Sequence, residues 1–375
     1  MVEHTNHNSA WGGPLPERTV TFPKDVSIGT LFVRDWHGTD DPFFSQGVWE
    51  EFGVAQGDVT VPAGQKLGLQ MKQDAKANAI ALANLNPNDL QALEVWHIDN
   101  EGMQPIAPLT GLKWFFVYES QLGDEGVGRL SGCSSLEFIG LFDCGKLDTS
   151  FATLKQLPNL AEIELGDTEL TPGAIRGLSE LPQLAYLWLE YMSINDAEFI
   201  ANFTLPPSLR HFAFGACESL TDAALAHIAK LYSAAEVPLL RFGVLHTPVS
   251  EAGIISVLKS MPTKQVESVW ISHTRSTAQV VDEIEGMTNL EELWAAGLPI
   301  TDEVLNRLEL LTKLESLDLS QTEITDKAIE TLSAFKNLKR VDVRETGVTS
   351  VGVEKLRQSL PTCEVLYEGA AVEWW

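Results

Sequence analysis

The chain has 375 residues, of which 44% are hydrophobic and 21% charged, a composition typical of a folded globular protein and not of a disordered or collagen-like one. Its 26 Lys and Arg against 52 Asp and Glu give a formal net charge of −26. This charge argues against nucleic acids and anionic membrane surfaces as partners, because both are bound by basic patches.

Two further features bear on where the protein works. Residues 1–19 contain no basic stretch followed by an apolar one, so they do not have the pattern of a secretory signal, and no run of 18 apolar residues predicts a membrane span. Four cysteines, Cys133, Cys144, Cys217 and Cys363, are too few for a disulfide-dense scaffold. We therefore expect a cytoplasmic protein.

Residues 1–87 do not repeat and are rich in strand-like runs. Such runs occur at 18–22, 27–36 and 58–71, and Pro62-Ala-Gly64 between two of them predicts a hairpin turn that pairs 59–61 with 66–71. We predict that this segment is a small β-rich cap on the N-terminal end of the remaining chain.

From residue 88 the sequence repeats with a period near 24. The anchors of the units are Leu93, Leu112, Leu136, Leu160, Leu184, Leu209, Leu239, Val266, Leu290, Leu314 and Leu338. Extra residues at 231–238 and 262–265 lengthen two units, and 360–365 reads as a closing strand. A fixed period over most of the chain predicts a stack of similar structural units.

Each unit changes its apolar period once. In the unit that starts at Leu314, Leu317 and Leu319 alternate as in a strand, whereas Ile329, Leu332 and Phe335 recur at helical spacing. The change occurs at Thr-Asp, where Thr can cap a helix and Asp suits its positive N-terminus. We therefore expect one strand and one short helix in every unit.

This pattern, LxxLxLxxTxITDxxLxxLxxL, resembles the leucine-rich repeat family over residues 88–366, which would comprise about 11 units, followed by a tail at 367–375. It is most similar to bacterial repeats with a Thr-Asp turn, and the units with Cys144 and Cys217 resemble the cysteine-containing, ribonuclease-inhibitor-like subclass. The resemblance implies an α/β solenoid with a curved parallel sheet inside and short helices outside. We expect the turn row to satisfy backbone groups; it consists of Cys144, Thr168, Cys217, Thr247, Thr274, Thr322 and Thr346.

Motifs for chemistry are missing from the sequence: it has no GxSxG, phosphate-binding loop, HExxH or CxxC. The cysteines fall at skeleton or turn positions, where a buried structural thiol is the simplest interpretation. His246 and His273 occupy equivalent positions of neighbouring units, which places them about 5 Å apart without a carboxylate to complete a metal site. We predict no catalytic residue, metal or cofactor.

The inner sheet face is the informative surface. With the anchor as position 1, side chains at positions 3, 5 and 7 point away from the helices, and position 8 lies at the edge. Aromatic and charged residues at these positions form the predicted binding surface: Trp114, Phe116, Tyr118, Phe138, Phe142, Glu164, Tyr186, Trp188, Glu190, Tyr191, His211, Arg241, Trp270 and Trp294. Gly140, Ala213, Gly215 and Gly243 stand among them, and we expect these small residues to leave room for a partner.

Exposed aromatic patches usually mark interaction surfaces, which favours a noncatalytic module that binds a protein or peptide on the concave face. The carboxylates beside the rings suit a basic partner. Cover by the N-terminal segment, or self-association, would also explain the rings.

Two other functions remain open from the sequence. A glycan could stack on the same aromatic platform, and an enzyme site could lie in the N-terminal segment, where Asp35, His37, Asp40 and Asp41 cluster. Trp374 and Trp375 could dock on the last unit or anchor a partner.

Overall fold

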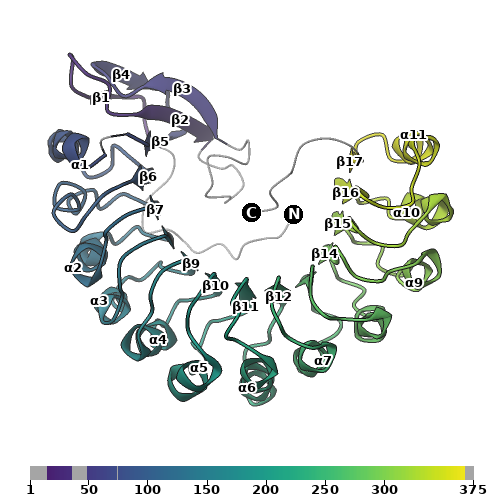
Figure 1. Ribbon diagram of the computed structural model, residues 1–375. Helices are drawn as coiled ribbons and strands as arrows, with labels where there is room; N and C mark the ends of the chain where they lie inside the picture. Colours follow the sequence, from purple (N-terminus) through teal and green to yellow (C-terminus); the bar gives the residue numbers. More distant parts are fainter. Residues whose placement is uncertain (1–14, 36–48, 74, 368–375) are drawn as a thin grey trace. The chain divides into compact units, whose positions relative to one another are not determined.

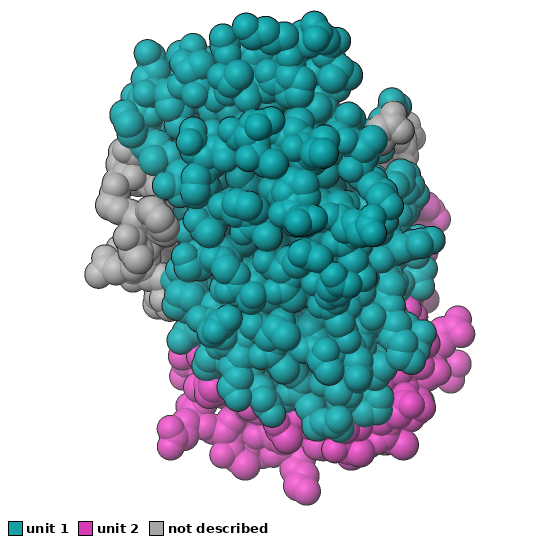
Figure 2. All heavy atoms as spheres, turned by 90° about the vertical axis from the view of Figure 1, so that its left-hand side faces the viewer, with its two compact units in different colours: residues 1–185 teal, residues 186–375 magenta. Residues whose placement is uncertain are grey.

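The structure is a computed structural model that describes residues 15–35, 49–73 and 75–367. It divides into two compact units, residues 1–185 and 186–375, which are coloured separately in Figure 2. His37, Asp40, Asp41, Trp374 and Trp375 lie outside the described residues.

The first unit contains a seven-strand run of sheet in the order β9-β8-β7-β6-β5-β2-β3. Its strands are β2 (Thr30–Asp35), β3 (Glu50–Val54), β5 (Gln65–Met71), β6 (Ala92–Trp96), β7 (Trp114–Tyr118), β8 (Phe138–Phe142) and β9 (Glu162–Gly166). Strands β5 to β9 are parallel, whereas β2 runs antiparallel to β5 and β3 antiparallel to β2. The N-terminal segment is β-rich, as predicted, and its strand β5 is hydrogen-bonded directly to the repeat strand β6.

The predicted hairpin between 59–61 and 66–71 is wrong. Strand β4 (Asp58–Val61) pairs instead with β1 (Arg18–Thr21) as a separate two-stranded antiparallel sheet. Strand β5 lies in the middle of the sheet, between β2 and β6, and is buried on both faces. A strand of a solvent-exposed hairpin could not occupy this central position. The Arg18 guanidinium bridges the two sheets by donating to the Gln65 carbonyl at 3.2 Å and to Gln91 Oε1 at 2.9 Å.

Short helices lie on one side of the first unit's parallel strands, and the other side of the sheet forms what we call the inner face (Figure 1). The helices are α1 (Ala75–Asn78), α2 (Asp124–Gly128), α3 (Ser150–Leu154) and α4 (Pro172–Ser179), with 3₁₀ turns η2 (Ala79–Asn84) and η3 (Arg129–Gly132).

The second unit has only parallel strands, in the order β17 to β10. They are β10 (Tyr186–Glu190), β11 (His211–Gly215), β12 (Arg241–Leu245), β13 (Ser268–Trp270), β14 (Glu292–Trp294), β15 (Ser316–Asp318), β16 (Arg340–Asp342) and β17 (Glu364–Leu366). The last of these confirms the predicted closing strand.

Helices again lie on one side of these strands (Figure 1). They are α5 (Asp196–Asn202), α6 (Asp222–Ser233), α7 (Glu251–Leu258), α8 (Val281–Ile284), α9 (Asp302–Asn306), α10 (Ile329–Ala334) and α11 (Ser350–Ser359), with 3₁₀ turns η4 (Ala278–Val280) and η5 (Asp326–Ala328). Helix α6, with 12 residues, takes up the start of the predicted insertion at 231–238.

The skeleton positions of the repeats form the core of both compact units. Positions 1, 4 and 6 of the repeat anchored at Leu314 are fully buried, as are those of the repeat anchored at Leu136. One anchor was wrong: Leu93 pairs with Phe115, which is position 4, so Leu90 and not Leu93 corresponds to Leu112. The sequence Leu90-Gln-Ala-Leu93-Glu-Val95 fits the LxxLxL pattern equally well, and only the strand register separates the two choices.

The turn row satisfies backbone groups, which confirms the prediction. The hydroxyls of Thr274, Thr322 and Thr346 donate to carbonyls three residues earlier at 2.9, 2.6 and 2.7 Å. Thr168 donates to the Gly166 carbonyl at 2.9 Å and accepts from the Cys144 N–H of the preceding unit at 3.2 Å. Among the described residues, the buried Thr247 hydroxyl has no such partner.

The Thr-Asp turn does more than cap its own helix. Thr301, Thr325 and Thr349 each accept a backbone N–H of the helix that they precede, as expected. The aspartate that follows reaches the next unit, where Asp302 accepts from the N–H and hydroxyl of Thr325 at 2.8 and 2.7 Å. Asp326 binds Thr349 in the same way at 2.8 and 2.7 Å. The motif therefore links successive repeats of the chain.

Every repeat strand from β6 to β16 is followed by one residue in the left-handed region, directly after β6 to β12 and three residues after β13 to β16. These residues are His97, Glu119, Asp143, Asp167, Tyr191, Ala216, His246, His273, Gly297, Gln321 and Glu345, with φ between 44° and 71°. Their N–H groups extend the sheet by one bond, as from His246 to the Ser272 carbonyl at 3.2 Å and from Gln321 to the Arg344 carbonyl at 2.9 Å. A left-handed residue costs about 1 kcal/mol when it is not glycine, so the turn toward the helix is held by the packed strands on both sides of it.

Candidate binding face

Strand register places the predicted residues in columns on the inner face. In the second unit one column runs Trp188, Ala213, Gly243, Trp270, Trp294, Asp318 and Asp342, and a second runs Tyr186, His211, Arg241, Ser268, Glu292, Ser316 and Arg340. In the first unit the corresponding neighbours are Trp114 with Phe138, Phe116 with Gly140, and Tyr118 with Phe142. The side-chain facing inferred from the sequence is therefore correct.

Facing the inner side does not mean exposure in the first unit. Trp114, Phe116 and Phe138 are only 1–2% exposed and form one cluster with Ala92 and with Trp49 from the N-terminal segment. The Trp49 and Trp114 rings meet edge to face at 5.9 Å, and the Arg34 guanidinium lies 5.3 Å from both ring centres. The expected exposed patch is wrong at these three rings, because the chain's own N-terminal segment covers them.

Gly140 provides space for these rings and not for a partner. A Cβ atom at Gly140 would lie 2.9 Å from Phe116 and Phe142 and 3.0 Å from Phe138. The three rings therefore close over the missing side chain, which corrects the expectation of an open slot at this position. Burial raises the pKa of Tyr118, and the charges of Glu94 and of Glu164 add to this shift; Glu164 is the half-buried neighbour of Gly140 in the next strand.

The second unit shows the same packing between strands that are further apart. Trp188 on β10 and Trp270 on β13 are separated by two strands, yet their ring centres are 5.5 Å apart. Both rings lean over Ala213 and Gly243, and a Cβ atom at Gly243 would lie 2.7 Å from the Trp270 ring. Trp188 and Trp270 are consequently 6% and 5% exposed, so this slot too is filled by the chain itself.

Other residues of this face keep more exposed surface. Tyr191 is 60% exposed, and Tyr186 and Trp294 are half-buried at the margins of the tryptophan cluster. The half-buried His211 meets the Tyr186 ring edge to face at 6.0 Å. These are the predicted aromatic residues of the second unit that are not fully buried.

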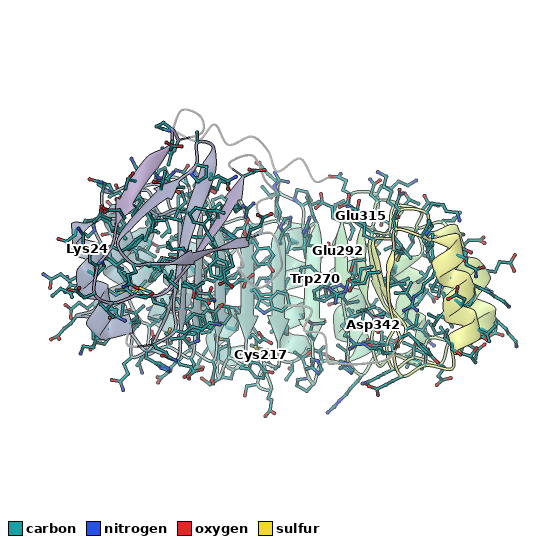
Figure 3. All side chains as sticks on the ribbon, turned by 90° about the horizontal axis from the view of Figure 1, so that it is seen from above. Lys24, Cys217, Trp270, Glu292, Glu315 and Asp342 are labelled. Atoms are coloured by element: carbon teal, nitrogen blue, oxygen red, sulfur yellow. The ribbon has the colours of Figure 1, made fainter. Side chains whose placement is uncertain are left out.

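Carboxylates adjoin the aromatic residues. Glu292 accepts from Trp270 Nε1 at 3.2 Å and from the Ser268 hydroxyl at 3.0 Å, and Figure 3 shows Trp270 and Glu292 together on the inner face. Arg241 is held by Glu267 at 3.1 Å. Burial raises the pKa of Glu190 and of Glu291, and the charge of Glu267 adds to the shift at Glu291.

The sequence pattern did not reveal several residues of the inner face. Trp96 stacks on Tyr118 at 4.6 Å, and Tyr118 stacks on Phe142 at 5.0 Å, which makes a three-ring ladder in the first unit. The correct anchor at Leu90 would have placed Trp96 at position 7. Glu292 and Asp318 lie at positions 3 and 5 of their repeats, which face the inner side, but the predicted binding surface does not include them.

One repeat of the chain matches a known family by sequence. The family model described as Leucine Rich repeat matches residues 311–333, within the unit at Leu314, whose skeleton, turn and cap form as the pattern predicts. The match shows that this unit is a leucine-rich repeat, and the other repeats of the chain share its strand, turn and short helix. Among solved structures it is similar to an internalin from Listeria monocytogenes, with 15% identity, a TM-score of 0.45, and coverage of 81% of this chain and 87% of the internalin. No curated protein matches it in sequence.

His246 and His273 lie side by side on neighbouring repeats, as the sequence predicts, and their rings are stacked. The rings of His246 and His273 lie 4.3 Å apart with 22° between their planes. Desolvation lowers the pKa of both, and the charge of His246 lowers that of His273 further, against a smaller opposing effect of Glu345. Both imidazoles are thus harder to protonate than an exposed histidine.

The four cysteines are unbridged. Burial raises the pKa of Cys133 to about 11 and that of Cys217 to about 12, so neither thiol is poised as a nucleophile. Within the described ranges no group of three or more His, Cys, Asp or Glu side chains is arranged to hold a metal ion. The helices of the described part of the chain are too short or too polar to cross a membrane.

Proposed function

We propose that this protein is a noncatalytic recognition module that binds a basic protein or peptide on the inner face of its second unit. Leucine-rich repeat proteins generally bind other proteins. The observation that carries the proposal here is that two strands of the inner face, β10 and β14, each present rings that are not fully buried beside a carboxylate: Tyr186 and Tyr191 with Glu190, and Trp294 with Glu292.

The physical reason is that rings and carboxylates supply different parts of a binding free energy. Aromatic side chains dominate interface energies because they bury a large area with few torsions to fix. Carboxylates next to them favour a cationic partner, and the net charge of −26 attracts such a partner over a longer range. The covered rings of the first unit contribute packing to the fold, so the proposed surface is smaller than the full aromatic list.

Affinity capture followed by mass spectrometry tests this proposal. The double variant Tyr191→Ala and Trp294→Ala should lose the partner that the wild-type chain retains, and the loss of the wild-type interaction should increase with salt concentration. Leu310→Ala is the matched control, because Leu310 is 63% exposed but precedes β15 on the helix side of the repeat. Equal capture by the double variant would contradict the proposal.

A glycan array distinguishes the main alternative. Binding of a sugar that is lost in the same double variant would assign the aromatic surface to carbohydrate instead of protein. We further propose the cytoplasm as the location of the protein, which fluorescence microscopy of the tagged full chain in its native host tests.

A further inference from the structure

Two kinds of link join the helix sides of neighbouring repeats in the second unit. A carboxylate at the start of one helix accepts from the next cap, as Asp302 does from Thr325 at 2.8 and 2.7 Å. In the turn before that cap, the Glu323 N–H donates to the Ile300 carbonyl of the preceding repeat at 3.0 Å. The following junction has the same two links, from Asp326 to Thr349 and from the Gly347 N–H to the Ile324 carbonyl.

The junction between helices α8 and α9 lacks both links in the described part of the chain. Ala278 stands where the carboxylate would be, so the cap Thr301 receives none from it. Pro299 stands at the position equivalent to Glu323, and a proline has no N–H to donate to the preceding turn. Two separate sequence positions therefore weaken the helix side at the same junction.

The strand side of this junction is intact. Strands β13 and β14 pair in register over their whole lengths, and the rings of Trp270 and Trp294 stack across them at 5.0 Å. Beyond the strands, the His273 N–H donates to the Ala296 carbonyl at 2.8 Å. The two repeats are thus held firmly on the inner face and linked weakly on the helix side, which is the arrangement of a hinge with its axis along the strands.

Arg307 bridges the helix side of this junction. It lies directly after α9 and forms ion pairs with Asp282 of α8 and, at 2.7 Å, with Glu285 directly after α8. The side chains of Arg307, Asp282 and Glu285 are 36%, 58% and 44% exposed. Ion pairs between exposed groups are weak and are screened by salt, unlike the missing carboxylate and backbone links.

We propose that the junction between α8 and α9 is a salt-sensitive hinge. The two repeats rotate about the pair of strands β13 and β14, and the ion pairs of Arg307 hold the helix side closed at low ionic strength. Screening of these ion pairs lets the helix side open, whereas the linked junctions before and after it stay closed. Such rotation changes the curvature of the inner face of the second unit.

Hydrogen exchange of the full-length chain, followed by mass spectrometry, tests the hinge. Opening of the junction exposes amides of both helices, so peptides from 278–310 should exchange about three- to tenfold faster in 1 M than in 0.05 M NaCl. Peptides from 326–359 cover α10 and α11, which have both links, and their exchange should change less than about twofold. These peptides also report whether the chain unfolds as a whole.

Two variants act on the hinge in opposite directions. Arg307→Gln removes the ion pairs, so peptides from 278–310 should exchange fast already at low salt and should gain little from further salt. Ala278→Asp supplies the missing carboxylate for Thr301, so the same peptides should exchange more slowly and lose most of their salt dependence. Slow exchange of 326–359 establishes that each variant is folded.

Lys259→Gln is the matched control. Lys259 forms an exposed ion pair with Glu283 of α8 at 3.3 Å, across the preceding junction. That junction keeps its carboxylate link, because Glu251 accepts from the N–H and hydroxyl of Thr277 at 2.8 and 2.7 Å. Loss of the Lys259 ion pair should therefore leave both the exchange and its salt dependence unchanged.

Three results would overturn the hinge. Salt could accelerate the exchange of 278–310 and 326–359 equally, which would show a general loss of stability and not a local opening. Arg307→Gln could exchange like the wild type at low salt, which would show that the ion pairs do not hold the junction closed. Lys259→Gln could act as strongly as Arg307→Gln, which would show that the missing links make no difference.

Discussion

Some glycines of the repeats are needed because a side chain at their position would collide with a neighbouring residue. Gly253 in α7 lies against the carboxylate of Asp222, and a Cβ atom there would meet Asp222 Oδ1 at 2.5 Å. That carboxylate accepts from the N–H and the hydroxyl of Ser250 at 2.7 and 2.5 Å, so the glycine makes room for the link between two units.

Gly253→Ala should therefore destabilise the protein by about 1–3 kcal/mol, because displacement of Asp222 breaks charge-assisted hydrogen bonds. Helix propensity alone predicts the opposite sign, with a gain of about 1 kcal/mol. Gly132→Ala is the matched control, since nothing lies within 4 Å of the added Cβ, and it should be neutral or slightly stabilising. Urea denaturation of both variants decides, and a stable Gly253→Ala would refute the packing argument.

The stacked histidines give a second prediction for individual residues. Because the pKa of His246 and of His273 lies below its ordinary value, the unfolded chain binds more protons than the folded one as the pH falls below about 6.5. The pair should therefore cost stability on acidification, and this cost grows until both rings are protonated.

The double variant His246→Gln and His273→Gln should lose less stability between pH 7.5 and pH 5.5 than the wild type does. The comparison between the two proteins cancels groups such as Asp318, whose raised pKa acts in the opposite direction. NMR titration of the imidazole protons provides the direct measurement. Values at or above 6.5 for both rings would contradict this account.

At the scale of the repeat element, aspartates at helix starts link neighbouring repeats. The links from Asp302 to Thr325 and from Asp326 to Thr349 tie each helix to the preceding one. In the unit with Thr277, Ala278 stands where this aspartate would be, so the next cap, Thr301, receives no carboxylate from it. Thr301 instead donates its hydroxyl to Glu303 at 3.0 Å.

Asp302→Ala should consequently lower the free energy of unfolding by about 1–3 kcal/mol, since it removes two charge-assisted hydrogen bonds. Ala278→Asp should raise it by about 0.5–1 kcal/mol, because it supplies the missing partner and an acidic residue at a helix N-terminus. Chemical denaturation measures the free energy of unfolding of both variants, with Glu309→Ala as an exposed control. The value should fall in Asp302→Ala and rise in Ala278→Asp. A change of the same sign in both would show that the links are not energetically important.

The repeating elements could be predicted from the sequence because their signal is periodic. The alternation at Leu317 and Leu319 and the Thr-Asp turn predict strand, cap and helix, and the structure confirms all three. The N-terminal strands were harder, since β4 pairs with β1 across 36 residues and no local pattern specifies that partner. The register of the first repeat failed because Leu90 and Leu93 satisfy the same motif.

At the scale of the whole chain, sequence predicts which side chains face inward but not whether they are covered. Trp49 covers Trp114 from a non-repeating segment, and Trp188 reaches Trp270 across two strands. Both ring contacts depend on how far a ring extends over a small neighbouring residue. The residue types at the inner-face positions do not specify that distance. Among the described residues of the second unit's inner face, Tyr191 is exposed and Trp294 is half-buried.

Hydroxyl-radical footprinting of the full chain, with and without its captured partner, is the most direct test of this account. We predict that partner binding protects Tyr186, Tyr191 and Trp294, while Trp114 and Phe138 are unreactive in both states because they are already buried. Protection confined to helix-side residues such as Leu310 and Val351, with Tyr191 and Trp294 unchanged, would contradict it.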